Sequence, residues 1–435
     1  MDMSQFCKKG TAANIGLILA VLFSFGAILL FALVNVFDIP SSVVDGYFPY
    51  ADAMYSGVIP YTDLVHVYGY DNVWEYPPLA YVFLFIPRLF GATPVTYSAA
   101  YIVMMVLFFI AGMWCADRLA RRFDFSRVKA ILAYSLVTVL MFEFVLDRFD
   151  MIPVVLMMFA ILFFSEKRYV WASVFLSLGM MVKLYPAILF PIFIMLMLRR
   201  GEKKNVLISM IAFVALAAAC VLPIMVAGGD IMMMFSYHTD RPLEVESLAA
   251  SVVEFISLLG LTDVTYVFSY GSVNVTGPLA DAICGYMMYI MIAAIVIFYA
   301  LYAIHLYKVR SSDEKTQMSE MNTVSAIAIM CFIVLGTVFS GQYMMWLIPM
   351  VVLFMMLPAE THMKKKVWWT FIIAEVLTQV DFAVNFALTT TGDPLSAVGI
   401  TVVLVRNILV LAMIFVLAKG TFGNLFKKTQ SVSCE

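Results

Sequence analysis

The sequence predicts an all-α polytopic membrane protein with about twelve transmembrane helices. Of the 435 residues, 63% are hydrophobic and only 13% are charged, which is more apolar surface than a soluble chain of this length can bury. The apolar residues are concentrated in runs long enough for membrane helices. Most of the 27 basic residues fall between alternate runs, as the positive-inside rule requires.

The apolar runs divide the chain into predicted spans. A spanning helix needs roughly 20 apolar residues, so we expect one membrane domain over residues 1–435 with these spans: 13–36, 97–117, 127–146, 150–165, 168–183, 185–199, 205–227, 279–306, 322–340, 343–358, 367–388 and 397–418. Several middle spans are short, and we expect Pro153, Pro186 and Pro191 to tilt or break them. The run 77–90 opens with two prolines, which predicts a re-entrant or juxtamembrane helix instead of a span.

The basic residues predict the orientation of the chain. Counting 77–90 as a span would move the basic segment 117–129 to the outer side and break the charge pattern. We therefore expect both termini in the cytoplasm, including the tail 419–435, and the two long loops 38–96 and 228–278 outside. Spans two to seven then cover 97–227, and spans eight to twelve cover 279–418. The apolar stretch 248–260 within the second loop is expected to lie on the bilayer surface.

Composition excludes several kinds of partner and site. The net charge of −2 gives no indication of nucleic-acid binding. The six cysteines are scattered singly, so we expect neither a disulfide framework nor a zinc site. The 32 methionines show no repeated spacing, and we interpret most of them as lipid-facing residues or core filler.

The first outer loop concentrates acidic residues. Residues 45–79 contain no Lys or Arg, and their acids are Asp45, Asp52, Asp63, Asp71 and Glu75. A carboxylate held near the membrane surface can act as a general base towards a hydroxyl acceptor. Asp45 follows the first span most closely, which makes it a candidate base. The residues alone leave open that all five acids are solvated loop charges.

Cations on the predicted outer side are candidates for binding a lipid phosphate. Lys183 ends a span, and His238 and Arg241 lie in the segment HTDRP; Lys, His and Arg are common phosphate ligands. Lys183 is alternatively a snorkelling residue, and Arg241 alternatively pairs with a neighbouring acid (Asp240, Glu244 or Glu246).

Two further charged groups have structural interpretations. Asp147, Arg148 and Asp150 form a tight outer turn and are expected to pair with one another. Asp381 and Arg406 lie in the last two spans, where an ion pair would lock the two helices together.

Four segments in order carry a family resemblance. They are DGYFPYADAMYSGVIPYTDL with EYPPLAY, MVKLYPAILFP, HTDRPLEVESLAAS and SGQYMMWLIP. Over about residues 45–350 the chain resembles glycosyltransferase family 87 of the GT-C superfamily, the polyprenyl-phosphate-mannose-dependent mannosyltransferase-like membrane proteins. The second residue of SGQY departs slightly from the family pattern.

The resemblance implies a GT-C-like fold and an inverting transfer of one sugar, mannose or another hexose or pentose. The donor would be a polyprenyl-phosphate sugar, the acceptor a lipid or glycan, and the location the outer face of a bacterial cytoplasmic membrane. Asp45 would be the base, and Lys183, His238 and Arg241 would hold the donor phosphate. No cofactor or metal is implied. The expected substrate-binding residues are Asp63, Glu75, Tyr76, Tyr185, Glu246, Gln342 and Tyr343.

Two rival functions stay open on sequence. Twelve spans with both ends inside also suit a transporter or a lipid-linked sugar flippase, although no repeat relates the two halves and the polar residues lie at one face. The second rival is a related membrane transferase or polymerase that moves oligosaccharides or aminoarabinose.

Overall fold

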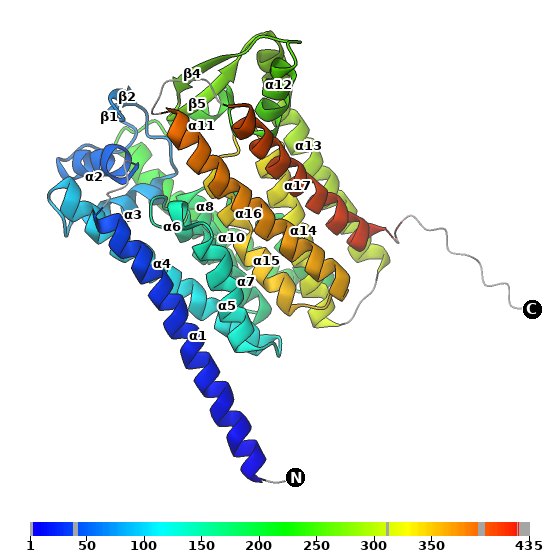
Figure 1. Ribbon diagram of the computed structural model, residues 1–435. Coiled ribbons are helices and arrows are strands. Elements are labelled where there is room, and N and C mark those ends of the chain that lie inside the picture. Colours follow the sequence, from blue (N-terminus) through cyan, green and yellow to red (C-terminus); the bar gives the residue numbers. More distant parts are fainter. Residues whose placement is uncertain (1–2, 38–41, 310–312, 390–395, 424, 426–435) are drawn as a thin grey trace, which may run out of the picture.

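The long helices form a bundle, with loops and short strands at one end of it (Figure 1). The computed structural model describes residues 3–37, 42–309, 313–389, 396–423 and 425. Within this part of the chain, seven helices are long and apolar enough to cross a membrane. They are α1 (Met3–Phe37), α4 (Pro94–Arg122), α10 (Lys203–Val226), α13 (Pro278–Lys308), α14 (Glu314–Val334), α16 (Thr361–Thr389) and α17 (Ala397–Phe422). The protein is therefore an all-α multi-pass membrane protein, as predicted.

The remaining predicted spans coincide with shorter helices. These are α5 (Arg127–Val139), α6 (Phe142–Val145), α7 (Met151–Ser165), α8 (Tyr169–Val182), η2 (Tyr185–Ile188), α9 (Leu189–Arg199), η3 (Gly341–Leu347) and α15 (Ile348–Met356). Pro186 lies in the first turn of η2, next to a break between helices. The prediction that Pro153 and Pro191 tilt or break their spans was wrong as to breaking. Both lie in the first turn of a helix, where proline is tolerated.

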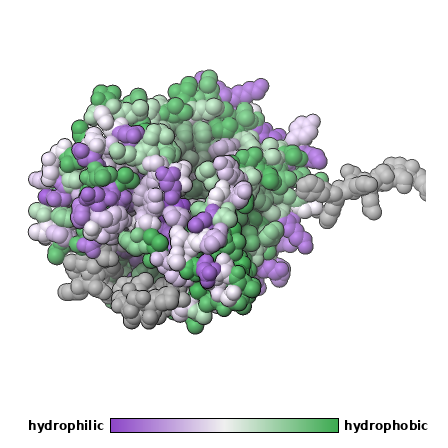
Figure 2. Space-filling view, turned by 90° about the horizontal axis from the view of Figure 1, so that it is seen from above, coloured by the Kyte–Doolittle hydropathy of each residue, from purple (hydrophilic) through white to green (hydrophobic). Residues whose placement is uncertain are grey.

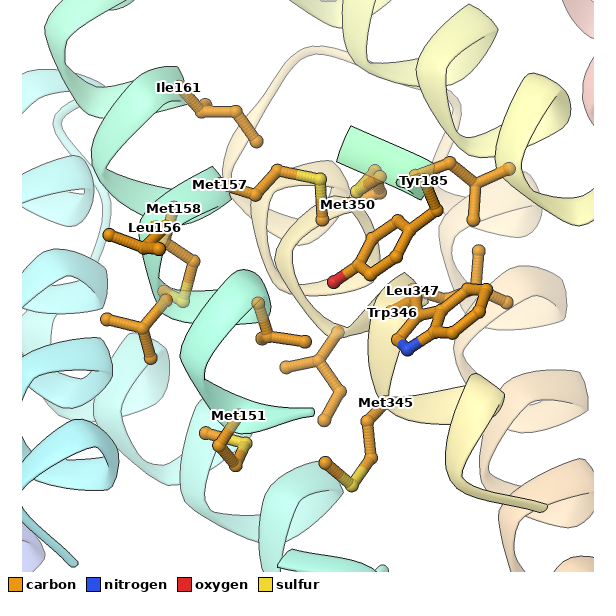
Figure 3. Packing of buried hydrophobic residues seen from close by; sticks show 14 of the residues in the cluster. Met151, Leu156, Met157, Met158, Ile161, Tyr185, Met345, Trp346, Leu347 and Met350 are labelled. Atoms are coloured by element: carbon orange, nitrogen blue, oxygen red, sulfur yellow. The ribbon is translucent and has the colours of Figure 1, made fainter. Parts of the chain in front are cut away.

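Helix α7 lies at the centre of the bundle. It is apolar on all sides, is buried along almost its whole length and packs against α4 and α8, as expected of a helix without a polar face. In this core Met157 of α7 and Met350 of α15 lie near Tyr185, and Met345 of η3 lies near Trp346 (Figure 3). By contrast, only 6% and 11% of the residues in the most apolar stretches of α10 and α13 are buried inside the protein. The surfaces of these two helices are therefore available to lipid.

The loop-bearing end contains the short elements. The first loop forms η1 (Ser42–Tyr47), α2 (Phe48–Tyr55), the hairpin β1 (Val65–Val67) and β2 (Tyr70–Asn72), and α3 (Pro78–Arg88). The second forms α11 (Met232–Thr239), β3 (Leu243–Glu244), α12 (Leu248–Leu258), β4 (Thr265–Ser269) and β5 (Ser272–Thr276). Both sheets are antiparallel; β5 lies between β3 and β4, with Leu243 opposite Val275. Helices α3 and α12 confirm the two short helices predicted from apolar runs, whereas the strands were not predicted.

Aromatic packing explains why the first loop is ordered. Trp74 is fully buried and packs against Tyr50, Tyr61 and Tyr81. Its indole N–H donates to the backbone oxygen of Asp63 at 2.7 Å. The Tyr61 hydroxyl likewise donates to the backbone oxygen of Tyr76. The loop therefore has a small aromatic core, which gives its acidic residues defined positions.

Candidate functional site

Charged side chains from distant parts of the sequence meet beneath the loops. We call Glu75, Asp147, Arg148, Asp150, Lys183 and Arg241 the loop-end cluster. They come from the first loop, the turn before α7, the end of α8 and the second loop. Hydrophilic residues also gather over part of the surface at this end of the molecule (Figure 2).

Lys183 and Asp150 form a buried ion pair. Helix α8 ends at Val182, and Lys183 adopts an extended backbone that directs its side chain away from the helix. Its Nζ donates to Oδ1 of Asp150 at 2.7 Å, and the two side chains are 16% and 1% exposed. The indole N–H of Trp346 donates to the same oxygen at 2.6 Å. Lys183 is therefore a buried, paired cation, and the snorkelling interpretation was wrong.

Arg148 and Asp147 connect the turn before α7 to the first loop. Arg148 Nε lies 3.0 Å from Oδ2 of Asp147, and the Ser42 hydroxyl donates to that oxygen at 3.0 Å. Burial raises the pKa of Asp147, and the Arg148 guanidinium opposes that shift. The expected pairing within this turn is thus confirmed for Asp147 and Arg148, whereas Asp150 pairs with Lys183.

Glu75 joins the two loops electrostatically. Burial raises the pKa of its carboxyl group, while hydrogen bonds from Tyr237 and Tyr76 and the charges of Arg241 and Lys183 lower it. The ring of Tyr76 packs edge-on against Phe149, 4.8 Å away, which places it beside the turn before α7. The structure therefore brings together the predicted residues Glu75, Tyr76, Lys183 and Arg241.

Arg241 is a buried cation without an ion-pair partner among the described residues. Its Nη2 donates to the Ser272 hydroxyl. Its Nε has no hydrogen-bond acceptor among the described residues. The alternative that Arg241 pairs with a neighbouring acid was wrong. A buried guanidinium with a free donor favours an anionic ligand.

Asp45 lies in η1, at the margin of the loop-end cluster. Its side chain is exposed, and its carboxylate makes no hydrogen bond or ion pair with the described residues. The backbone N–H of Tyr68 donates to the Asp45 carbonyl at 3.0 Å. The next residue, Gly46, lies against the phenol of Tyr68, where a Cβ would collide. These contacts fix the backbone of Asp45 and leave its carboxylate accessible.

Other predicted site residues surround the cluster. Tyr343 stacks on Trp346 with ring centroids 3.8 Å apart, and Tyr185 stacks on the opposite face at 4.1 Å. Gln342 is half-buried in η3. Asp63 is exposed and accepts a hydrogen bond from the Thr62 hydroxyl. The backbone of His238 belongs to α11, but its side chain lies outside the described residues.

Glu246 pairs with a further buried cation, Arg406 of α17. Arg406 is fully buried and donates to Oε2 of Glu246 at 2.9 Å and to its backbone oxygen at 2.6 Å. The predicted Asp381–Arg406 pair is also present, at 3.9 Å. Asn407 donates to the backbone oxygen of Glu246 at 3.0 Å. Arg406 therefore fastens the second loop to the last two long helices.

Sequence reasoning missed Trp346 and the partnership of Asp150 with Lys183. The available signal was the position of Asp150 directly before the wholly apolar helix α7, because an acid there needs a partner from another element. Among the described residues no group of three or more His, Cys, Asp or Glu side chains could hold a metal ion. The site thus offers buried cations, and the helix η1, which contacts Asp147 through Ser42, carries the accessible carboxylate of Asp45; buried cations suit an anionic leaving group, and a carboxylate suits activation of a hydroxyl nucleophile.

Comparison with known proteins gives structural likenesses and a family match. The crystal structure of ArnT from Cupriavidus metallidurans bound to undecaprenyl phosphate superposes with a TM-score of 0.49 and 13% sequence identity. The match covers 93% of this chain and 78% of ArnT. No curated protein sequence matched the chain. The model of glycosyltransferase family 87 matches residues 74–333, which is more than half of the chain and includes the whole loop-end cluster. The chain therefore belongs to glycosyltransferase family 87, and it is a membrane glycosyltransferase.

Proposed function

We propose that this enzyme transfers a single sugar from a polyprenyl-phosphate donor to a lipid or glycan acceptor, with inversion at the anomeric carbon. The sugar would be mannose or another hexose or pentose. The fold would be of the GT-C type, and the reaction would take place at the outer face of a bacterial cytoplasmic membrane, with both termini in the cytoplasm. The ArnT structure contains undecaprenyl phosphate, which is a polyprenyl phosphate of the kind that such a donor would carry.

The burial of Lys183 and Arg241 beneath the loops is the main support for this proposal. When the sugar leaves its carrier, the bond between the anomeric carbon and the phosphate oxygen breaks and the polyprenyl phosphate gains negative charge. Donors fixed in a water-poor site stabilise such charge more strongly than donors in water. Lys183, Arg241 and His238 would bind this phosphate, and the Nε of Arg241 has no hydrogen-bond acceptor among the described residues.

Asp45 suits the role of general base. The acceptor hydroxyl must lose its proton as its oxygen bonds to the anomeric carbon, on the face opposite the leaving phosphate. Asp147 and Asp150 each already form an ion pair with a cation. The carboxylate of Asp45 has no partner among the described residues and is accessible from outside, so it is free to take the proton.

The other predicted residues would orient the sugar. Glu75, Tyr76 and Tyr343 border the cations, and we assign them to the sugar hydroxyls together with Gln342. Tyr185 would act through its stacking on Trp346. Asp63 and Glu246 lie in the same loops and would contribute from the rim. The proposal requires no cofactor or metal, because Lys and Arg can stabilise a leaving phosphate.

The test is sugar transfer in membrane vesicles supplied with a panel of polyprenyl-phosphate sugars. Asp45→Asn should lower transfer by about 10²–10⁴-fold, the usual contribution of a general base. Asp71→Asn is the matched control: Asp71 is an exposed acid in the same loop that pairs with His66, and its loss should leave the rate unchanged.

Each outcome of this test changes the assignment in a defined way. Full activity of Asp45→Asn would move the base to Asp63, Glu75 or Asp150. A second outcome is that the protein transfers sugar from none of the donors, while a known transferase in the same vesicles does. That outcome would contradict the assignment of a polyprenyl-phosphate sugar as donor and favour the alternative of a lipid-linked sugar flippase.

A further inference from the structure

We infer that Asp150 and Trp346 form a rigid support that holds the Lys183 ammonium group at the donor phosphate. Asp150 is then a positioning residue for Lys183, and it is not the base. This inference rests on the proposed function, in which Lys183 binds the phosphate of the carrier lipid.

The hydrogen bonds at Asp150 carry the inference. One carboxylate oxygen, Oδ1, accepts from both the Lys183 ammonium at 2.7 Å and the Trp346 indole at 2.6 Å. Two donors on one oxygen fix both the position and the direction of the carboxylate. Asp150 is 1% exposed, so water competes little for these bonds. Oδ1 is thus occupied by two donors of the protein itself, and Oδ2 is buried without a hydrogen-bond partner among the described residues.

The support is itself rigid. Trp346 lies between two aromatic rings: Tyr185 is nearly parallel to it, at an interplanar angle of 6°, and Tyr343 is inclined by 23°. The indole therefore cannot turn its N–H away from Asp150 without unstacking both rings. A site that must hold a charge in place needs such a packed second layer of residues.

The surroundings of Lys183 oppose its charge, and Asp150 compensates. Burial lowers the pKa of Lys183, and the charge of Arg148 lowers it further, whereas Asp150 and Glu75 raise it. The rings of Phe149, Tyr343 and Trp346 lie 5.1, 5.4 and 5.4 Å from Nζ and stabilise the cation as well. Without the Asp150 carboxylate, Lys183 would lose its proton at a lower pH.

The ammonium retains donors for a ligand. Lys183 has three N–H groups, and among the described residues only Asp150 accepts from Nζ. The other two N–H groups are thus available to phosphate oxygens. Asp150 determines where they point, and Trp346 determines where Asp150 lies.

The experiment compares Asp150→Asn, Asp150→Glu and Trp346→Phe with the wild type in the full-length protein. Two quantities are measured between pH 6 and pH 10: binding of a polyprenyl phosphate to the purified protein, and sugar transfer in vesicles. Asp150→Asn keeps the shape of the side chain and removes its charge, so the alkaline limb of both profiles should move to lower pH by about one unit, a tenfold loss of protonated Lys183 above that pH.

The other variants sharpen the result. Asp150→Glu keeps the charge and should restore the alkaline limb. Trp346→Phe keeps the carboxylate but not its second hydrogen bond, so the KM for the donor should rise while the alkaline limb moves less. Asp117→Asn is the matched control, because Asp117 is a buried acid that pairs with Arg121 and Arg127 away from the site; it should leave both profiles unchanged.

The inference is overturned if Asp150→Asn binds polyprenyl phosphate with the wild-type pH profile. It is also overturned if Asp150→Asn and Asp150→Glu bind normally but both abolish transfer at every pH, because Asp150 would then act as a catalytic residue. Failure of the wild type to transfer any sugar, with binding and its pH shift intact, would contradict the proposed donor and leave the support for Lys183 standing.

Discussion

The two ends of the bundle differ in how far most of their ion pairs are exposed. At the loop-bearing end, Asp150 is buried and Lys183 nearly so. At the other end, which α4 reaches at Arg122 after 29 residues (Figure 1), several ion pairs lie at the surface, although Asp117 is buried between Arg121 and Arg127. Arg118 and Glu166 are 44% and 25% exposed there, and they lie 3.5 Å apart.

This difference in exposure distinguishes surface charges from charges whose burial indicates a specific role. Exposed ion pairs contribute about 0–1 kcal/mol, and their residues follow the positive-inside rule whether or not they pair. A buried ion pair loses more in desolvation, so its presence indicates a function or a structural lock. The loop-end cluster is a candidate for a functional site, and the pair of Arg406 and Glu246 is a candidate for a structural lock.

The largest stability effect is expected at Arg406. Replacing it with Gln leaves Glu246 and Asp381 without their cation and removes the two hydrogen bonds to Glu246. Loss of one partner from a buried pair costs about 3–5 kcal/mol, so the melting temperature of the detergent-purified protein should fall clearly. An unchanged melting temperature would show that Arg406 does not fasten the second loop. Exchanging Arg406 and Glu246 tests whether the pair itself matters, because the exchanged pair should recover part of the loss.

A smaller, pH-dependent effect is expected at Glu244. Burial, reinforced by the charge of Glu246, raises the pKa of Glu244 from 4.5 to about 8. A carboxyl group with a raised folded-state pKa stabilises the fold below its unfolded pKa, and this stability is lost as the pH rises from about 4.5 through about 8.

Glu244→Gln should therefore remove part of the loss of stability in alkali. The variant keeps an oxygen for the backbone N–H of Phe339, which donates to Glu244 at 3.1 Å. We expect the variant to be more stable than the wild type above pH 8 and similar to it near pH 5, as measured by melting temperature across pH. Parallel curves for the two proteins would rule out this role of Glu244.

The smallest effect is expected at the opposite end. Arg118→Gln breaks the exposed pair with Glu166, and its cost should stay within about 0.5 kcal/mol. Sugar transfer should not change, because no residue of the loop-end cluster contacts this end. A loss as large as that of Arg406→Gln would invalidate the distinction between the two ends.

Much of the architecture was predictable because it depends on local properties. Hydrophobic runs located every long helix, and the short apolar stretches at 77–90 and 248–260 gave α3 and α12. The strands β1 to β5 were not predictable in this way. They are two to five residues long, and they form by pairing within loops whose composition favours turns.

The candidate site was predictable only in part. Glu75, Lys183 and Arg241 were identifiable by charge type near predicted helix ends, and the structure brings them together. Asp45 was identifiable by its position after the first span. The partner of Lys183 was not identified, because Asp150 lies 33 residues away in sequence, before α7, whereas Lys183 follows α8, and Arg148 offered Asp150 a nearer cation.

The sequence by itself determined the membrane class, the positions of the long helices and the kinds of charge available at the loop-bearing end. These follow from transfer of side chains between water and lipid, which acts on each segment separately. Only the tertiary structure decided which charges meet. Asp150 accepts from Lys183 and Trp346, and Glu246 from Arg406, because the packing of α7, α8, η3 and α17 brings those side chains within hydrogen-bonding distance. Burial makes such partnerships obligatory, and spacing along the chain does not specify them.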